Sequence, residues 1–199
     1  MRMCKNYMSS EFFERRQYGI RYIFNTCSVC NDKTCNVIRC DIWRLVMRIW
    51  HYKLIPVLPR QQLLGQWREC CAISKMILQE KECKHLLVRK VTEYPAWMWM
   101  CYQYDIQKEM KKRGYLISPS TMFAIGDNTM RAEEEGYFAD DDAFDFMMYM
   151  NDPFPGWHND RYLLQCYFNL EEKYDCGGIP EDEWLKIDHY MRSINILWL

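Results

Sequence analysis

Hydrophobic side chains recur at helical spacing in four stretches of the chain, and the first stretch covers residues 59–72. Pro59 suits the first position of a helix because its φ angle is already helical and its missing N–H is not needed there. Two neighbouring stripes then repeat at i, i+4 and i+7. The apolar stripe contains Leu63, Trp67 and Cys70, and the polar stripe contains Gln62, Gln66 and Glu69. The stretch therefore predicts an amphipathic helix.

Three further stretches combine helical periodicity with helix end signals. Residues 96–113 end in the basic run 111–113 and a glycine, which suits the carbonyl end of a helix. A third helix is expected to begin at Asn159 or Asp160, and a fourth at Pro180. The expected inward positions are Trp97, Cys101 and Tyr104, then Leu163, Leu164, Tyr167 and Leu170, then Trp184, Ile187 and Met191. Alternating strand patterns are scarce, so the sequence predicts an all-α (mainly α) fold.

Composition narrows the class of protein without identifying it. Hydrophobic residues make up 49% of the 199 residues, which fits a packed core. No apolar run reaches the roughly 18–20 residues of a membrane span, and the N-terminus lacks the apolar region of a signal peptide. The 11 cysteines, without an export signal, favour reduced thiols or a metal site over disulfides. We therefore expect a cytoplasmic protein with one domain, or one domain and an appendage.

The net charge of -1 conceals a segregation of charges along the chain. Residues 47–116 carry 13 bases and 6 acids, whereas residues 117–199 carry 5 bases and 17 acids. The basic part favours a polyanionic partner through its local field. The acids concentrate near residues 127–152, which we interpret as a solvated loop or insertion. A cation site there is the weaker alternative, because the spacing is not that of a calcium loop.

The stretch Met47–Ala72 carries a resemblance to a known family. It reads MRIWHYKLIPVLPRQQLLGQWRECCA and resembles the start of bacterial proteins related to the phage pyrimidine-dimer DNA glycosylase. The resemblance resumes, in the same order, at KHLLVRKVTEYP (84–95), EMKKRGY (109–115) and HNDRYLLQCYFNLEEK (158–173). It implies a compact helical domain over 47–199 with an acidic insertion near 127–152. Residues 1–46 then form an N-terminal extension that contains several cysteines.

The resemblance implies a monomeric repair enzyme, a glycosylase with abasic-site lyase activity on double-stranded DNA that contains ultraviolet-induced pyrimidine dimers. A free N-terminal amine attacks C1′ and forms an imine, and a carboxylate assists base loss and strand cleavage. By position these groups are Met47, as a free N-terminus, and Glu69. An α-amine has a pKa of about 8, so part of it is unprotonated at neutral pH. The implied DNA contacts are Arg48, Gln62, Arg68, Lys111, Lys112 and Arg113, and no cofactor is required.

Met47 is an internal residue of this chain, and its amide nitrogen has no usable lone pair. Three interpretations follow. The working protein begins at Met47, or the extension is removed by processing, or the chain binds DNA without lyase chemistry or with a side-chain amine such as Lys53. We favour the first interpretation, because the resemblance begins sharply at a methionine.

Each candidate residue also has a structural interpretation. Without the resemblance, Glu69 is a charge on the polar face of a surface helix, and the run 111–113 caps a helix. His51, His85 and His158 lie in the matching blocks, and isolated histidines are more often structural hydrogen-bonding groups than catalysts.

Four cysteines in the extension suggest a different function. Cys27, Cys30, Cys35 and Cys40 follow the spacing C-x2-C-x4-C-x4-C, which is close to that of a zinc knuckle. Four thiolates satisfy a tetrahedral Zn, and knuckles bind single-stranded nucleic acid. The loop lacks the glycines and the aromatic residue that such knuckles carry. The alternative function is a non-catalytic, zinc-dependent nucleic-acid-binding protein.

Overall fold

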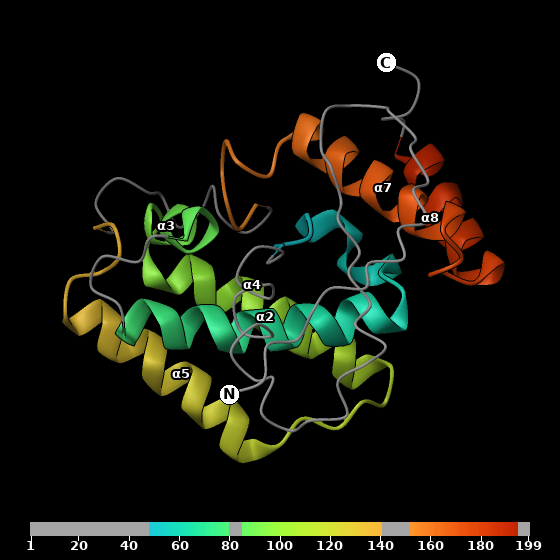
Figure 1. The fold of residues 1–199 in the computed structure, drawn as a ribbon. Coiled ribbons are helices and arrows are strands. Elements are labelled where there is room, and N and C mark those ends of the chain that lie inside the picture. Colours follow the sequence, from blue (N-terminus) through green and yellow to red (C-terminus); the bar gives the residue numbers. More distant parts are fainter. Residues whose placement is uncertain (1–47, 80–84, 141–151, 195–199) are drawn as a thin grey trace, which may run out of the picture. The chain divides into compact units, whose positions relative to one another are not determined.

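The computed structural model describes residues 48–79, 85–140 and 152–194, which all lie in one compact unit of the chain. These residues form helices and no strand, which confirms the predicted all-α fold (Figure 1). The elements in chain order are η1 (Tyr52–Val57, a 3₁₀ helix), α2 (Arg60–Gln79), α3 (Leu86–Thr92), α4 (Ala96–Lys112), α5 (Pro119–Glu134), α7 (Asp160–Asp175) and α8 (Glu181–Ser193). Within these ranges no helix is long and apolar enough to cross a membrane. Outside the described residues lie the predicted extension 1–46 with Cys27, Cys30, Cys35 and Cys40, and also Met47.

Helix α2 packs against α3, α4 and α5 and provides one face of the hydrophobic core (Figure 1). It begins at Arg60, one residue after the predicted start, and it ends at Gln79 rather than at residue 72. The predicted apolar stripe is buried. The same buried face continues in Ile73, Ser74 and Ile77. This continuation accounts for the additional two turns of helix.

The other three predicted helices are present at the predicted positions. Helix α4 ends before Gly114, whose positive φ of 75° forms the expected left-handed cap. The Asn159 side chain caps α7 by accepting the N–H of Tyr162, and α8 begins directly after Pro180. The predicted inward positions of α7 and α8 are buried, except that Leu164 is half-buried.

The predicted inward face of α4 is wrong in part. Tyr104 is 62% exposed, and Trp97 and Cys101 are only half-buried. The core positions of this helix are instead Met98, Trp99, Tyr102 and Ile106. The start of the helix is apolar on nearly every side, so its sequence fits two helical registers equally well. Only the packing against α2, α5 and η1 selects one register.

Two helices lack clear sequence signals. Helix α3 is short, and α5 exposes the apolar side chains of Met122, Phe123 and Met130, which blurs its periodicity. Its buried residues are Ile125, Thr129 and Ala132. Residues 127–134 of the predicted acidic insertion belong to this helix, and residues 141–151 lie outside the described part of the chain.

A buried polar chain joins α2, α4 and α5. The hydroxyl of Ser74 accepts hydrogen bonds from Trp99 Nε1 at 2.8 Å and from Gln103 Nε2 at 3.1 Å. Thr129 donates its hydroxyl proton to the carbonyl of Ile125, so the 3.1 Å contact between Ser74 and Thr129 is donated by Ser74. Each donor in this network therefore has an acceptor, and these hydrogen bonds fix the three helices relative to one another.

Candidate active site

The Glu69 carboxyl lies half-buried on α2, next to the backbone that enters the domain. We call residues 48–51, which precede η1, the entry segment. The backbone N–H of Arg48 donates to Oε2 of Glu69 at 3.2 Å. Burial raises the pKa of Glu69 from 4.5 to about 7, against the opposing effects of this hydrogen bond and of the charges of Arg48, Arg68 and Lys173. A carboxyl that titrates near neutrality can both hold and accept a proton at physiological pH.

Side chains from three helices hold the entry segment, which belongs to neither a helix nor a strand. Gln66 on α2 accepts the N–H of Trp50 at 2.8 Å. Tyr102 on α4 donates its hydroxyl to the Trp50 carbonyl at 2.7 Å, and Tyr162 on α7 donates to the carbonyl of Ile49. Gln66, which belongs to the predicted polar stripe, is fully buried, because its amide oxygen accepts this backbone N–H.

The resemblance assigns the nucleophile to the residue directly before Arg48. That residue, Met47, lies outside the described residues. The N–H of Arg48, which follows it in the sequence, contacts Glu69.

Three cations act electrostatically on the carboxyl. Arg48 places its guanidinium 5.0 Å from the centre of the Trp50 ring, and Arg68 is exposed on α2. Lys173, exposed near the end of α7, also acts electrostatically on Glu69. Lys173 was not among the predicted site residues, although it is the last residue of the matching block 158–173. Helical periodicity gave no signal for it, because its electrostatic effect on Glu69 links residues more than one hundred positions apart in the sequence.

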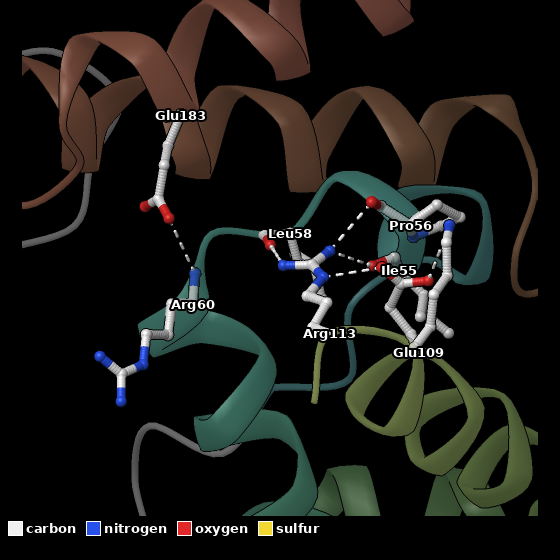
Figure 2. A network of polar contacts seen from close by, with 8 residues as sticks. Ile55, Pro56, Leu58, Arg60, Glu109, Arg113 and Glu183 are labelled. Atoms are coloured by element: carbon white, nitrogen blue, oxygen red, sulfur yellow. Dashed lines mark hydrogen bonds and ion pairs between the residues drawn. The ribbon is translucent and has the colours of Figure 1, made fainter. Parts of the chain in front are cut away.

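The basic run at the end of α4 divides into two exposed residues and one that is engaged inside the protein. Figure 2 shows the Arg113 guanidinium among the carbonyls of the η1 region. It donates to the carbonyls of Leu58 at 2.6 Å, Pro56 at 2.9 Å and Ile55 at 3.4 Å, and to Glu109 at 2.7 Å. Four of its five N–H donors are thus used internally. Lys111 and Lys112 are exposed, and Lys112 also pairs with Glu109 at 3.6 Å.

Two other predicted groups lie elsewhere on the domain. Gln62 is half-buried, and it lines a hollow of about 310 Å³ together with Arg60 and Glu183. Glu183 also accepts the first N–H of α2, that of Arg60, at 3.4 Å (Figure 2). Lys53, the alternative amine, pairs with Asp160 at 3.8 Å.

The predicted zinc ligands lie outside the described residues. Within the described ranges, no group of three or more histidine, cysteine, aspartate or glutamate side chains is arranged to hold a metal ion.

Comparison with known proteins finds one family model that is similar to part of this chain. Residues 47–122 match the family model described as pyrimidine dimer DNA glycosylase. No curated protein and no solved structure matches the chain. The matched region contains Arg48, Gln62, Arg68 and Glu69, as well as the basic run 111–113. Over residues 47–122, this chain is similar to the pyrimidine dimer DNA glycosylase family.

Proposed function

We propose that this protein is a DNA glycosylase with abasic-site lyase activity on pyrimidine dimers, and that its nucleophile is the α-amine of residue 47 once that amine is free. The hydrogen bond from the Arg48 N–H to Glu69 carries the proposal. It brings Arg48, the second residue of the matched region, to a half-buried carboxyl. This arrangement unites a candidate nucleophile with a candidate acid and base.

The proposed chemistry uses Glu69 in both protonation states. As a carboxylate it accepts a proton from the amine, whose nitrogen then bonds to C1′ while the bond between C1′ and the base breaks. The base leaves as an anion that takes a proton from water. Protonated Glu69 then gives its proton to O4′ as the C1′–O4′ bond breaks, which opens the sugar and leaves an iminium at C1′. This iminium makes the C2′ proton acidic. Removal of that proton breaks the 3′ carbon–oxygen bond, and the strand is nicked with the phosphate as leaving group. A pKa of about 7 lets one carboxyl perform these transfers in turn.

Cations near the site supply the proposed DNA contacts. Arg48, Arg68 and Lys173 act electrostatically on Glu69, and Lys111 and Lys112 are exposed at the end of α4. Such side chains bind phosphate and orient the duplex without reading its sequence. Reaching C1′ requires local distortion of the duplex, at a cost of a few kcal/mol that phosphate contacts offset. We propose that the protein acts as a monomer without a cofactor.

Borohydride trapping tests this proposal. The substrate is a duplex with one cyclobutane thymine dimer, and the proteins are the full chain, a chain beginning at Met47, and that shorter chain with Glu69→Gln. The bulky Arg48 should leave the initiator methionine in place. We expect a covalent adduct with the shorter chain, none with the full chain, and no nicking by the variant. Glu172→Gln, an exposed change on α7, is the matched control and should retain activity.

Other outcomes assign other functions. An adduct with the full chain would point to a side-chain amine. DNA binding without an adduct from any chain, together with about one zinc per chain, would support the zinc-dependent binding protein instead.

A further inference from the structure

A stacked pair of histidines joins the end of the entry segment to the start of α7. The rings of His51 and His158 lie 4.9 Å apart with an angle of 23° between their planes. His51 is fully buried and His158 is 3% exposed. The pair is separated by more than one hundred positions in the sequence, so it ties together two distant parts of the domain.

Hydrogen bonds fix both rings in one neutral tautomer. Nδ1 of His51 accepts the N–H of Lys53 at 3.2 Å, and Nδ1 of His158 accepts the N–H of Tyr52 at 3.2 Å. Each ring therefore carries its proton on Nε2, and the Nε2–H of His51 donates to the carbonyl of His158 at 2.8 Å. Burial lowers the pKa of His51 to about 4, with smaller effects from the charges of Lys53 and Asp160, and lowers that of His158 well below its usual range.

The position of the His158 imidazole in the core is energetically unfavourable for one ring nitrogen. Its Nε2 is buried and has no hydrogen-bond partner in the described part of the protein. Its ring packs among the aromatic side chains of Tyr102, Phe154, Trp157 and Tyr162. An apolar side chain would fill the same space without leaving a buried polar atom unpaired. The feature that only the imidazole supplies is the Nδ1 acceptor for the Tyr52 N–H.

We propose that His51 and His158 are positioning residues that hold the entry segment in the register that brings the Arg48 N–H to Glu69. The proposal rests on the function proposed above. Gln66, Tyr102 and Tyr162 hold the middle of the entry segment, and the histidine pair holds its end. Since the segment has no helix or strand of its own, these side chains supply its restraint. Displacement of a reacting group by about 1 Å can slow a reaction 100-fold.

The first readout uses the full chain and needs no DNA. The Arg48 amide proton contacts Glu69, so its NMR shift should titrate with the Glu69 carboxyl near pH 7. The indole N–H of Trp99, bonded to Ser74 in the core, reports whether a variant is folded. The second readout is the trapping rate, measured in the form of the chain that forms the adduct.

The variants separate the Nδ1 acceptor from the bulk of the ring. His158→Leu removes the acceptor and keeps an apolar side chain of moderate size, whereas His158→Asn keeps an oxygen near the place of Nδ1. We expect His158→Leu to abolish the Arg48 titration and to slow trapping about 10- to 100-fold. His158→Asn should keep the titration and stay within about three-fold of the native rate. His189→Leu, at an exposed position of α8, is the control and should match the native protein.

A second pair of variants covers the case in which His158→Leu does not fold. His51→Gln can still donate to the His158 carbonyl, whereas His51→Asn keeps only the acceptor for the Lys53 N–H. We expect the Arg48 titration to survive in His51→Gln and to be lost in His51→Asn.

Two results would overturn the positioning proposal. One is an unchanged Arg48 titration and trapping rate in folded His158→Leu, and the other is a failure of His158→Asn to restore either readout. If the titration follows the expected pattern but no chain forms an adduct, the histidines still hold the entry segment and the lyase proposal fails.

Discussion

Glu69→Gln should stabilise the fold at alkaline pH while removing the proposed chemistry. The carboxylate is half-buried, and burial is the main cause of its raised pKa. Its principal hydrogen-bond donor is the backbone N–H of Arg48, which can donate equally well to the amide oxygen of glutamine. The substitution therefore removes a buried charge and leaves the hydrogen bond in place.

The size of the effect follows from the pKa. Between the ordinary value of 4.5 and about 7, native Glu69 binds a proton that the unfolded chain has released. The free energy of unfolding of the native protein therefore falls as the pH rises through this interval. At about 1.4 kcal/mol for each pH unit, the total loss from this group is about 3 kcal/mol. Glutamine does not ionise, so the variant avoids that loss.

Urea unfolding of the full chain and of Glu69→Gln, at about pH 4.5 and about pH 8.5, measures the difference. Near pH 4.5 the two proteins should have similar free energies of unfolding, and at pH 8.5 the variant should be more stable by about 3 kcal/mol. Other titrating groups are common to both proteins and cancel in the comparison. Glu172→Gln makes the same chemical change at an exposed position, so it isolates the contribution of burial.

A variant that is no more stable than the native protein at the higher pH would refute this reasoning. A difference of the same size at both pH values would refute it as well, because the protonation effect is small at pH 4.5, where folded Glu69 is neutral and the unfolded chain is only half ionised.

Three further predictions concern stability and are measured by urea unfolding at constant pH. Arg113→Lys should lower the free energy of unfolding by about 2–3 kcal/mol, because an ammonium cannot reproduce four internal hydrogen bonds. Lys112→Met, at the exposed neighbouring position, should change it little. Equal effects of the two substitutions would contradict the role of the guanidinium. Ser74→Ala should lower the free energy of unfolding by about 2 kcal/mol, because it leaves the buried donors of α4 unpaired. A loss below about 0.5 kcal/mol would show that these buried hydrogen bonds do not stabilise the fold as argued. Gly114→Ala should destabilise the fold by about 1 kcal/mol, because the φ angle of this residue is 75°. Gly126→Ala should stabilise the fold by about 0.5–1 kcal/mol, because Gly126 lies inside α5 with open space around it. Effects of the same sign at both positions would contradict this reasoning.

The sequence predicts the helices whose ends carry strong local signals. The cap at Asn159, the proline before α8 and the glycine after α4 are all visible within a few residues, and all three ends lie where the signals place them. Helix α5 has a partly exposed apolar face, so no local rule separates its buried from its exposed positions. The inward face of α4 is ambiguous for a related reason, and Tyr104 is the position that local periodicity misplaces.

The sequence predicts a site residue only where a short stretch of the chain carries a signal for it. The family resemblance points to Glu69, whereas periodicity alone places it among surface charges. The pairing of His51 with His158, and the proximity of Lys173 to Glu69, arise from packing of α7 against distant segments. No pattern in one stretch of sequence encodes these contacts. The matching block 158–173 contained two of these residues but gave no indication of what they would contact.

Two members of the polar stripe of α2 contact backbone from another part of the chain, and this contact explains the behaviour of Glu69. Gln66 accepts the N–H of Trp50, and Glu69, one turn later, accepts the N–H of Arg48. This part of the stripe therefore faces the entry segment rather than water. Backbone N–H groups satisfy a carboxylate oxygen but bring no full positive charge, so the loss of hydration outweighs their effect. A surface glutamate with the same helical spacing would titrate near its ordinary value, whereas the covering segment moves Glu69 to about 7 and into the range where it can transfer protons.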